Sequence, residues 1–203
     1  CEVQEAMPLY CLSNHECVFK IPDAASSCNE QDNINALQAY EFIDFLSDQA
    51  DIPVDELVIR QLNRYFIATA TSTLTPGAYR KGQNSVGGYQ PPDQGDVLGL
   101  MRSFALWLRQ DDDGLHPAVK SGLAHLHLLA VHPFWDGNGR TSRGLETLLL
   151  QRSSFDFKKL LSLEATLLEM KDEYFLAISR SLGNRFQDGY DATPWLEFST
   201  SAL

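Results

Sequence analysis

A continuous apolar run that a proline stops constrains this chain more than any other feature. Residues 123–131 are mostly Leu, Ala and Val, and His132 and Pro133 follow them. Because a proline disfavours the α conformation in the residue before it, we predict a buried helix that ends at His132. Gly137 and Gly139 predict a turn, and the leucines after them predict a second helix over about residues 140–150. The centre of the fold is therefore expected to be a helix, a loop and a helix.

The expected loop gathers several groups that serve phosphate chemistry. His132 can take a proton near neutral pH, and Asp136 offers the oxygen ligands that Mg²⁺ accepts. Arg140 and Arg143 are three residues apart, so they share a helix face beside the unshielded N–H groups of the helix start. A capped histidine, a plain turn and a solvated arginine face are the simpler reading of each part alone. Together the parts supply the components of phosphoryl or nucleotidyl transfer.

Residues 132–143 match His-x-Phe-x-(Asp/Glu)-Gly-Asn-Gly-Arg-x-x-Arg at every specified position, and in this the chain resembles the Fic family. The resemblance implies an all-α fold, a Fic helical bundle with one small β-hairpin flap. It also implies a protein adenylyltransferase, which moves AMP from ATP to a Ser, Thr or Tyr hydroxyl of a target protein. ATP is then the substrate, and Mg²⁺ the expected metal.

The resemblance assigns a role to each signature residue. His132 would be the general base on the target hydroxyl, and Asp136 would hold Mg²⁺. Phe134 would anchor the loop, and the turn after it would cradle the phosphates. The residues expected to act in catalysis are His132, Asn138, Arg140 and Arg143. The residues expected to bind the nucleotide are Phe134, Gly137, Asn138, Gly139, Arg140, Arg143 and Tyr174.

Tyr174 belongs to a further expected helix, over about residues 171–182. In relatives, the corresponding region helps to enclose the base, so its ring could stack on adenine. A Tyr followed by Phe175 at helical spacing is also typical of a hydrophobic core. Both interpretations stay open at this point.

The N-terminal part resembles the inhibitory helix of the family. Ser26 and Glu30 have the spacing of its (Ser/Thr)-x-x-x-Glu-(Gly/Asn) motif, although Gln31 departs from the last position. Glu30 would pair with Arg143 and so misplace the nucleotide. A capping serine with a glutamate in the first turn explains the same residues. We expect an arm and inhibitory helix at residues 1–50 and a catalytic core at residues 51–203, whose first helix opens at Pro53.

Residues 82–92 are rich in Gly, Tyr and Pro, and they resemble the family's flap. A flap pairs its main chain with an extended target segment and so presents a hydroxyl to the base. An ordinary surface turn is the alternative. If the resemblance holds, the partner is a protein with a hydroxyl side chain that docks on this flap.

The overall charge limits the classes of partner. The formal net charge is -11 at pH 7, which argues against a generic nucleic-acid or anionic-membrane surface. A hydrophobic content of 44% fits one globular domain. No apolar run approaches the roughly 20 residues of a membrane span, and no secretory leader is visible. We therefore expect a cytoplasmic protein without a membrane partner.

The four cysteines are confined to the start of the sequence: Cys1, Cys11, Cys17 and Cys28. Disulfides, a metal site with His15 and free thiols are all open, and the spacing favours free thiols because it fits no standard zinc pattern.

Two other functions compete with adenylyl transfer. The same site could hydrolyse an AMP–protein bond or transfer another phosphate-containing group. A nucleotide-binding regulatory module that acts by protein contact is an alternative of another class. The sequence leaves the target, its acceptor residue and a homodimer open.

Overall fold

The computed structural model describes residues 27–68, 75–110, 114–153, 155 and 163–203. Over these residues the chain forms helices and no strand, which confirms the all-α expectation. The helices are α1 Ser27–Asp48, α2 Glu56–Phe66, α3 Gln94–Leu108, α4 Pro117–Val131, α5 Asn138–Arg152, α6 Leu163–Glu169, α7 Lys171–Leu182 and α8 Thr193–Ser201. Ser26 and the cysteines Cys1, Cys11 and Cys17 lie outside the described residues.

The expected β-hairpin is not confirmed as a pair of strands. Within the described residues, the flap contains one isolated antiparallel bridge between Val86 and Tyr89. Each of these two residues donates its main-chain N–H to the other's carbonyl, at 3.0 and 2.9 Å. Gly87 between them has a φ of 55°, a conformation that glycine adopts without strain. The flap is thus a tight turn with extended main chain on both sides.

The start of α2 differs from the expectation that Pro53 opens it. The helix begins at Glu56, because Asp55 caps it and accepts hydrogen bonds from the N–H groups of Leu57 and Val58, at 2.9 and 3.1 Å. An aspartate that satisfies these otherwise unpaired donors is a strong N-cap. Pro53 therefore lies in the segment before the helix.

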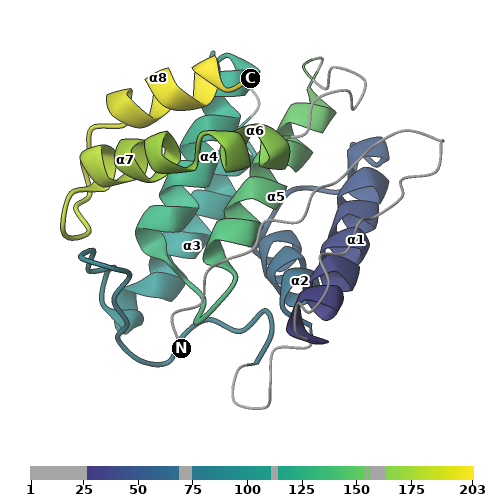
Figure 1. Cartoon of the computed structure of the whole chain (residues 1–203), viewed down its shortest axis with the longest axis horizontal. Coiled ribbons are helices and arrows are strands. Elements are labelled where there is room, and N and C mark those ends of the chain that lie inside the picture. Colours follow the sequence, from purple (N-terminus) through teal and green to yellow (C-terminus); the bar gives the residue numbers. More distant parts are fainter. Residues whose placement is uncertain (1–26, 69–74, 111–113, 154, 156–162) are drawn as a thin grey trace.

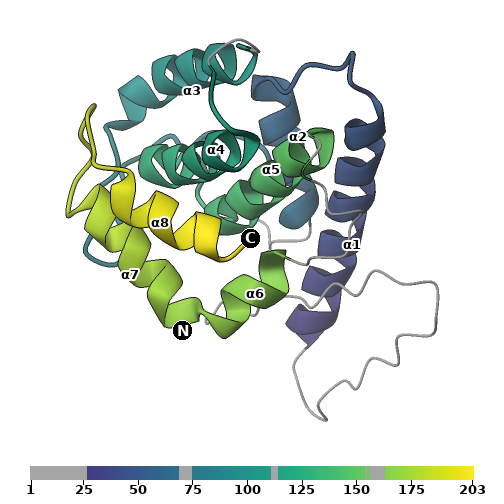
Figure 2. The ribbon, with the colours of Figure 1, turned by 90° about the horizontal axis from the view of Figure 1, so that it is seen from above.

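Helices α4 and α5 lie side by side in the middle of the molecule (Figure 1). Figure 2 shows α1 and α2 on one side of this pair, with α7 and α8 on the other. The α4 helix serves two cores: Ala124 and Leu128 face the cluster shared with α1, α2, α3 and α5, while Leu126 and Ala130 face the cluster of α6, α7 and α8. A helix between two cores must be apolar on most of its surface, which explains the continuous run at residues 123–131.

The α1 helix packs into the same core as the helices that follow it. Its buried side chains include Tyr40 and Ile43, which join a cluster with Phe66 of α2. At Gly144 of α5 a β-carbon would lie 2.7 Å from Phe66 and 3.2 Å from Ile43, so the three helices approach closely there. The division expected at residue 50 thus falls between helices of one shared core, and it stays a prediction about function.

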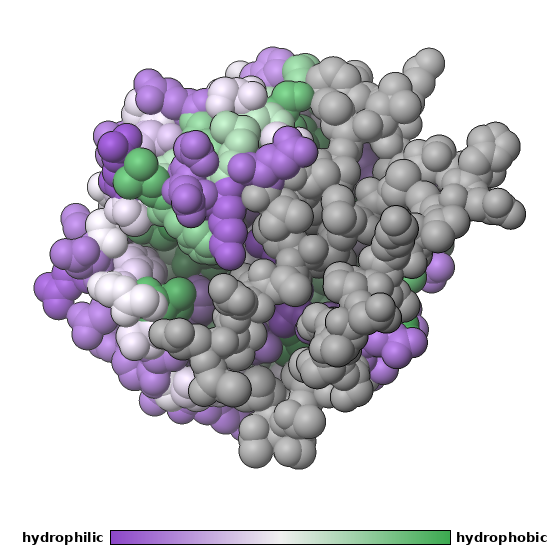
Figure 3. Space-filling view, in the orientation of Figure 1, coloured by the Kyte–Doolittle hydropathy of each residue, from purple (hydrophilic) through white to green (hydrophobic). Residues whose placement is uncertain are grey.

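On the face in Figure 3, hydrophilic residues surround smaller hydrophobic areas. Among the helices of the described part, none is long and apolar enough to cross a membrane.

Candidate active site

The site begins where α4 ends, at a strained histidine. His132 has a φ of 48° and a ψ of 58°, and it is the sole non-glycine residue with positive φ in the described ranges. Its N–H still donates to the carbonyl of Leu128, at 2.9 Å. The helix ends at this residue, as the proline after His132 predicted, although the conformation is left-handed and not the extended one that usually precedes a proline. Strain of this kind is held mainly at functional positions.

The loop after His132 is closed by two hydrogen bonds between Phe134 and Asn138. The N–H of Phe134 donates to Oδ1 of Asn138 at 3.0 Å, and Nδ2 of Asn138 donates to the carbonyl of Phe134 at 2.9 Å. Both side chains are buried, and the Phe134 ring contacts Tyr79 in the core. Phe134 therefore anchors the loop from the inside, while the Asn138 amide is used to close it.

The glycine turn packs against α2. Gly137 has a φ of 75°, and a β-carbon there would lie 2.6 Å from Cγ2 of Ile67, so a side chain fits neither the conformation nor the space. The fully buried amide of Asn63 holds the turn by donating to the carbonyl of Asp136 at 2.9 Å and to Thr141 Oγ1 at 3.2 Å. Sequence reasoning missed Asn63. The available signal was that a polar residue stands among the apolar residues of this helix. The turn leads into α5, whose first N–H groups have no partners within the helix.

The two signature arginines have different surroundings. Nη1 of Arg140 lies 3.1 Å from the carbonyl of Phe66 and 3.4 Å from Asp32 Oδ1, and its Nη2 lies 3.5 Å from Asp136 Oδ2. Arg143 is buried and faces a cavity that His132 also lines. Arg140 is thus tied to protein acceptors, and Arg143 points to a space that a ligand can fill.

That cavity has a volume of about 350 Å³ and brings together residues from α5, α7 and the flap. It contains four of the predicted site residues, namely His132, Gly139, Arg143 and Tyr174. Val86 and Tyr89 close it from the flap, and Phe175 and Ile178 close it from α7. Neither Asp136 nor Arg140 lines it, so both lie beside the cavity at the start of α5.

Burial controls the protonation of His132. Desolvation lowers its pKa from 6.5 to about 4, and the charge of Arg80 acts in the same direction, while a main-chain hydrogen bond with Leu129 and the charge of Asp136 oppose the shift. The imidazole is therefore neutral at pH 7. A neutral imidazole is the form that can accept a proton.

Asp136 is suited to a metal ion only with help from a ligand. Its Oδ1 accepts the N–H of Gly137 at 2.6 Å, and its side chain is 41% exposed. No group of three or more His, Cys, Asp or Glu residues that could hold a metal occurs within the described residues. One accessible carboxylate with nucleotide phosphates and water is a usual Mg²⁺ arrangement, so the residues fit the ion in that form.

Arg80 joins the flap to the base, and sequence reasoning missed it. The side chain is buried; its Nε donates to the carbonyl of His132 at 3.0 Å, and its Nη1 donates to the carbonyl of Gly82 at 3.0 Å. Its Nη2 donates to the carbonyl of Pro92 at the other end of the flap. Its role could not be inferred locally, because its partners are main-chain carbonyls and one of them, that of His132, lies 52 residues further along the chain.

The flap is also fixed on its far side. The hydroxyl of Tyr89 donates to the carbonyl of Ala130 at 2.8 Å, and the N–H of Gln90 donates to the carbonyl of Asn184 at 2.9 Å. Val86 at the tip is 43% exposed. The two ends of the flap are thus held to the rest of the protein, while its tip is exposed.

Glu30 does not contact Arg143 in this structure. It lies exposed in the first turn of α1, and in the described part of the chain no ion pair joins the two. Asp32, half a turn further on, contacts Arg140 instead. Ser26, the other predicted inhibitory residue, is outside the described residues, so the inhibitory role of both stays a prediction.

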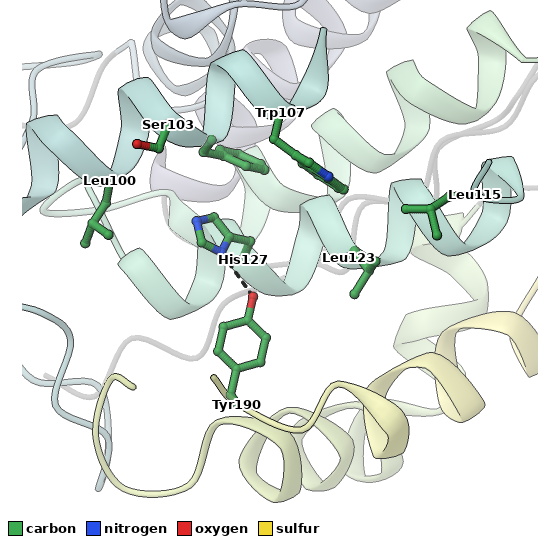
Figure 4. A pocket seen from close by; sticks show the side chains of 8 residues that line it. Leu100, Ser103, Trp107, Leu115, Leu123, His127 and Tyr190 are labelled. Carbon is green, nitrogen blue, oxygen red and sulfur yellow. Dashed lines mark hydrogen bonds between the residues drawn. The ribbon is translucent and has the colours of Figure 1, made fainter. Parts of the chain in front are cut away.

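A second cavity of about 350 Å³ lies between α3 and α4 (Figure 4). Its walls include Trp107 and His127, and the hydroxyl of Tyr190 lies 3.1 Å from His127 Nδ1. Burial lowers the pKa of His127 to about 4 and raises that of Tyr190 to about 12, so the tyrosine is the donor. None of the predicted site residues lines this cavity.

Comparison with known proteins identifies the family. The Fic/DOC family model matches residues 53–150. Protein adenylyltransferase Fic of Drosophila virilis and that of Drosophila melanogaster are each 46% identical over 80 residues, which are 39% of this chain and 16% of each relative. Over residues 53–150, this chain therefore matches the Fic/DOC family.

Solved structures agree with this fold. A Fic family protein from Desulfovibrio desulfuricans superposes with a TM-score of 0.70 at 25% identity, over 88% of this chain and 52% of that one. A Fic domain containing signaling protein from Bacteroides thetaiotaomicron gives 0.75 at 21% identity, over 89% and 70%. The latter likeness concerns the fold alone.

Proposed function

We propose that this chain is a protein adenylyltransferase, which moves AMP from ATP to a Ser, Thr or Tyr hydroxyl of a target protein. The observation that carries the proposal is the cavity in which a neutral, partly buried histidine lies with a buried arginine near the start of a helix. The names of the Drosophila relatives support it.

In the proposed reaction His132 removes the proton of the target hydroxyl. The oxygen attacks the α-phosphorus of ATP as the bond to pyrophosphate breaks, so AMP becomes esterified to the target. The proton stays on the imidazole, and the bonding electrons leave with pyrophosphate. The closed loop between Phe134 and Asn138 holds His132 for this step, because it fixes the chain on one side of the base.

The phosphates would bind at the start of α5. Gly137 and Gly139 leave the first N–H groups of the helix uncovered, and the helix dipole favours an anion there. Arg143 from the cavity wall and Arg140 beside it would bind the β- and γ-phosphates and stabilise the leaving pyrophosphate. Binding would draw Arg140 from its weak contact with Asp32.

Asp136 would hold Mg²⁺ through its exposed carboxylate, with the remaining ligands from the nucleotide and water. The ion would supply positive charge to the phosphate oxygens. The hydrogen bonds that close the loop, and the general base His132, would come from the chain itself.

The target would dock on the flap by adding an extended segment to its main chain. Two observations support this mode: the tip of the flap is exposed at Val86, and Arg80 holds the start of the flap through the carbonyl of Gly82. Because main-chain hydrogen bonds read no side chains, the flap would place the hydroxyl near His132 without selecting a strict sequence.

Inhibition by Glu30, with Ser26 as its partner residue, is part of the proposal. The start of α1 lies beside the start of α5, as the contact between Asp32 and Arg140 demonstrates. Because Glu30 lies half a turn from Asp32, the first turn of α1 would have to rewind to bring the Glu30 carboxylate toward Arg143. Such a contact would compete with the γ-phosphate.

The test is the intact mass of the protein, and of candidate targets, after incubation with ATP and Mg²⁺. Wild type, Glu30→Gly, and Glu30→Gly combined with His132→Asn are compared. We expect an added adenylate in Glu30→Gly, less in wild type, and a rate about 10²–10⁴ lower without the base.

The matched control is His127→Asn, which removes another buried histidine with an equally lowered pKa, in the cavity of Figure 4. It should retain the transfer rate. ATP binding without transfer to any protein would contradict the proposal and favour a nucleotide-binding regulatory module. Release of AMP from a modified protein would instead indicate the hydrolase.

A further inference from the structure

Three buried polar side chains form a chain of hydrogen bonds behind the cavity. His125 of α4 lies with its Nδ1 2.6 Å from Oε2 of Glu146 on α5, and with its Nε2 3.0 Å from the hydroxyl of Tyr174 on α7. Their exposed fractions are 0%, 1% and 5%. The network therefore joins three helices in a place that water does not reach.

The first hydrogen bond joins the two most deeply buried members of the network. In the tautomer with the proton on Nδ1, His125 donates it to Oε2 of Glu146. Oε1, the second carboxylate oxygen of Glu146, is buried without a hydrogen-bond partner within the described part of the structure. The bond from His125 is thus what compensates the burial of this carboxylate. Trp195 packs 4.7 Å from the His125 ring and 5.6 Å from the Tyr174 ring, which holds both in place.

The network connects α5 and α7, which both contribute residues to the cavity wall. Tyr174 lines the cavity on α7, and Glu146 lies one turn after Arg143 on α5. A hydrophobic cluster alone would bury Tyr174 without selecting one orientation, whereas directional hydrogen bonds select one. The spacing between the tyrosine ring and the arginine is thereby tied to His125.

We infer that His125 and Glu146 are positioning residues, which hold Tyr174 and α7 at the distance from Arg143 that the nucleotide requires. The inference rests on the proposed function, since it concerns the affinity of the same cavity for ATP. Neither His125 nor Glu146 lines the cavity, so both would act on the nucleotide through Tyr174 and α7. Their effect is on binding and not on the chemical step.

The first variant is Tyr174→Phe, which removes the hydroxyl and keeps the ring and the His125–Glu146 bond. Calorimetry with ATP and Mg²⁺ should give a Kd about three- to tenfold higher than that of wild type, the loss expected for one hydrogen bond. In transfer kinetics, the loss should appear in the KM for ATP more than in kcat. Glu146→Gln keeps an acceptor for Nδ1–H and should give a smaller rise in Kd.

The chain offers a matched control in Tyr190→Phe (Figure 4). Tyr190 also has its hydroxyl bonded to a histidine of α4, but at His127, which faces the other cavity. This variant should lower the thermal midpoint about as much as Tyr174→Phe and leave the Kd for ATP unchanged.

The outcomes separate the inference from the proposed function. If wild type binds ATP and Tyr174→Phe binds it equally well, the network is only structural and the inference is wrong. Equal rises in Kd for the two tyrosine variants would also overturn it, because the effect would then follow general destabilisation. If wild type binds no ATP, the proposed function fails, and the inference fails with it.

Discussion

The Nε of Arg80 donates a hydrogen bond of 3.0 Å to the main-chain carbonyl of His132. The same guanidinium donates to carbonyls at both ends of the flap, Gly82 and Pro92. One side chain therefore sets the position of the flap relative to the residue proposed as the base. In the proposed reaction, the distance between the target hydroxyl and the imidazole would depend on this link.

Arg80→Lys should reduce transfer to a protein target at least tenfold, because an ammonium group cannot reach three carbonyls in the planar arrangement of a guanidinium. Loss of these charged hydrogen bonds should also lower the free energy of unfolding by about 2–4 kcal/mol. The Kd for ATP should change little, since Arg80 does not line the cavity. Transfer kinetics, urea unfolding and calorimetry measure the three quantities.

Arg152→Lys is the control for Arg80. Arg152 lies at the far end of α5 and also donates to main-chain carbonyls, those of Leu46 and Gln49. It should destabilise the protein without loss of transfer in the folded fraction. Equal losses of transfer in both variants would show that Arg80 has no special relation to the flap.

The pH dependence of transfer should reflect the low pKa of His132. The imidazole acts as a base only when neutral, and burial lowers its pKa to about 4. We expect kcat/KM, which reports the free enzyme, to stay level from pH 8 to pH 6 and to fall only as pH approaches 4. Initial rates from pH 4 to 8 test this, and a half-maximal rate near 6.5 would contradict it.

Two partly buried histidines, His127 and His132, should make the fold less stable in mild acid. The pKa values of His127 and His132 fall from 6.5 to about 4 on folding, so between these values the unfolded chain binds more protons. The free energy of unfolding is therefore highest above pH 6.5 and falls below it, by about 2 kcal/mol for each histidine at pH 5. Urea unfolding of His127→Gln at pH 7 and 5 should show a pH dependence smaller by that amount. An unchanged dependence would refute the assignment.

The carboxylates at the start of α1 should differ in their effect on ATP binding. Asp32 contacts Arg140 at 3.4 Å with its side chain 45% exposed, a pair of small energy. Asp32→Asn should therefore raise ATP affinity only about two- to threefold. Glu30→Gln should raise it more if α1 moves as the inhibitory proposal requires. Calorimetry gives the Kd for ATP of both variants and of the control Glu41→Gln, which changes another exposed carboxylate of α1. The larger gain in affinity identifies the carboxylate that competes with ATP. No gain for Glu30→Gln would end its inhibitory role.

The loop of the site could be predicted because its conformation is local. Pro133 restricts the residue before it, Gly137 tolerates a positive φ, and the periodic leucines require a helix after the turn. These constraints act within a few residues, so they hold whatever the rest of the chain does. The fold class followed from the same periodicity together with the family signature.

The partners of the loop could not be predicted in this way. Asn63 lies 73 residues before Asp136, and Arg80 lies 52 residues before His132. A polar residue in α2 or in the flap does not reveal which main-chain groups it will meet. Likewise, the carboxylate that meets Arg140 is at residue 32, because the rotation of α1 against α5 is decided by packing at Ile43 and Gly144.

By itself, the sequence determined the helical class, the end of α4 at His132, the glycine turn and the grouping of a base, a carboxylate and two arginines. These depend on backbone sterics and short-range periodicity. Tertiary structure alone decided that Tyr174, the flap and Arg143 line one cavity, that Arg80 ties the flap to His132, and that His125 links Glu146 to Tyr174. Such relationships arise from the packing of whole helices against shared cores, and no local pattern encodes which distant side chains that packing brings together.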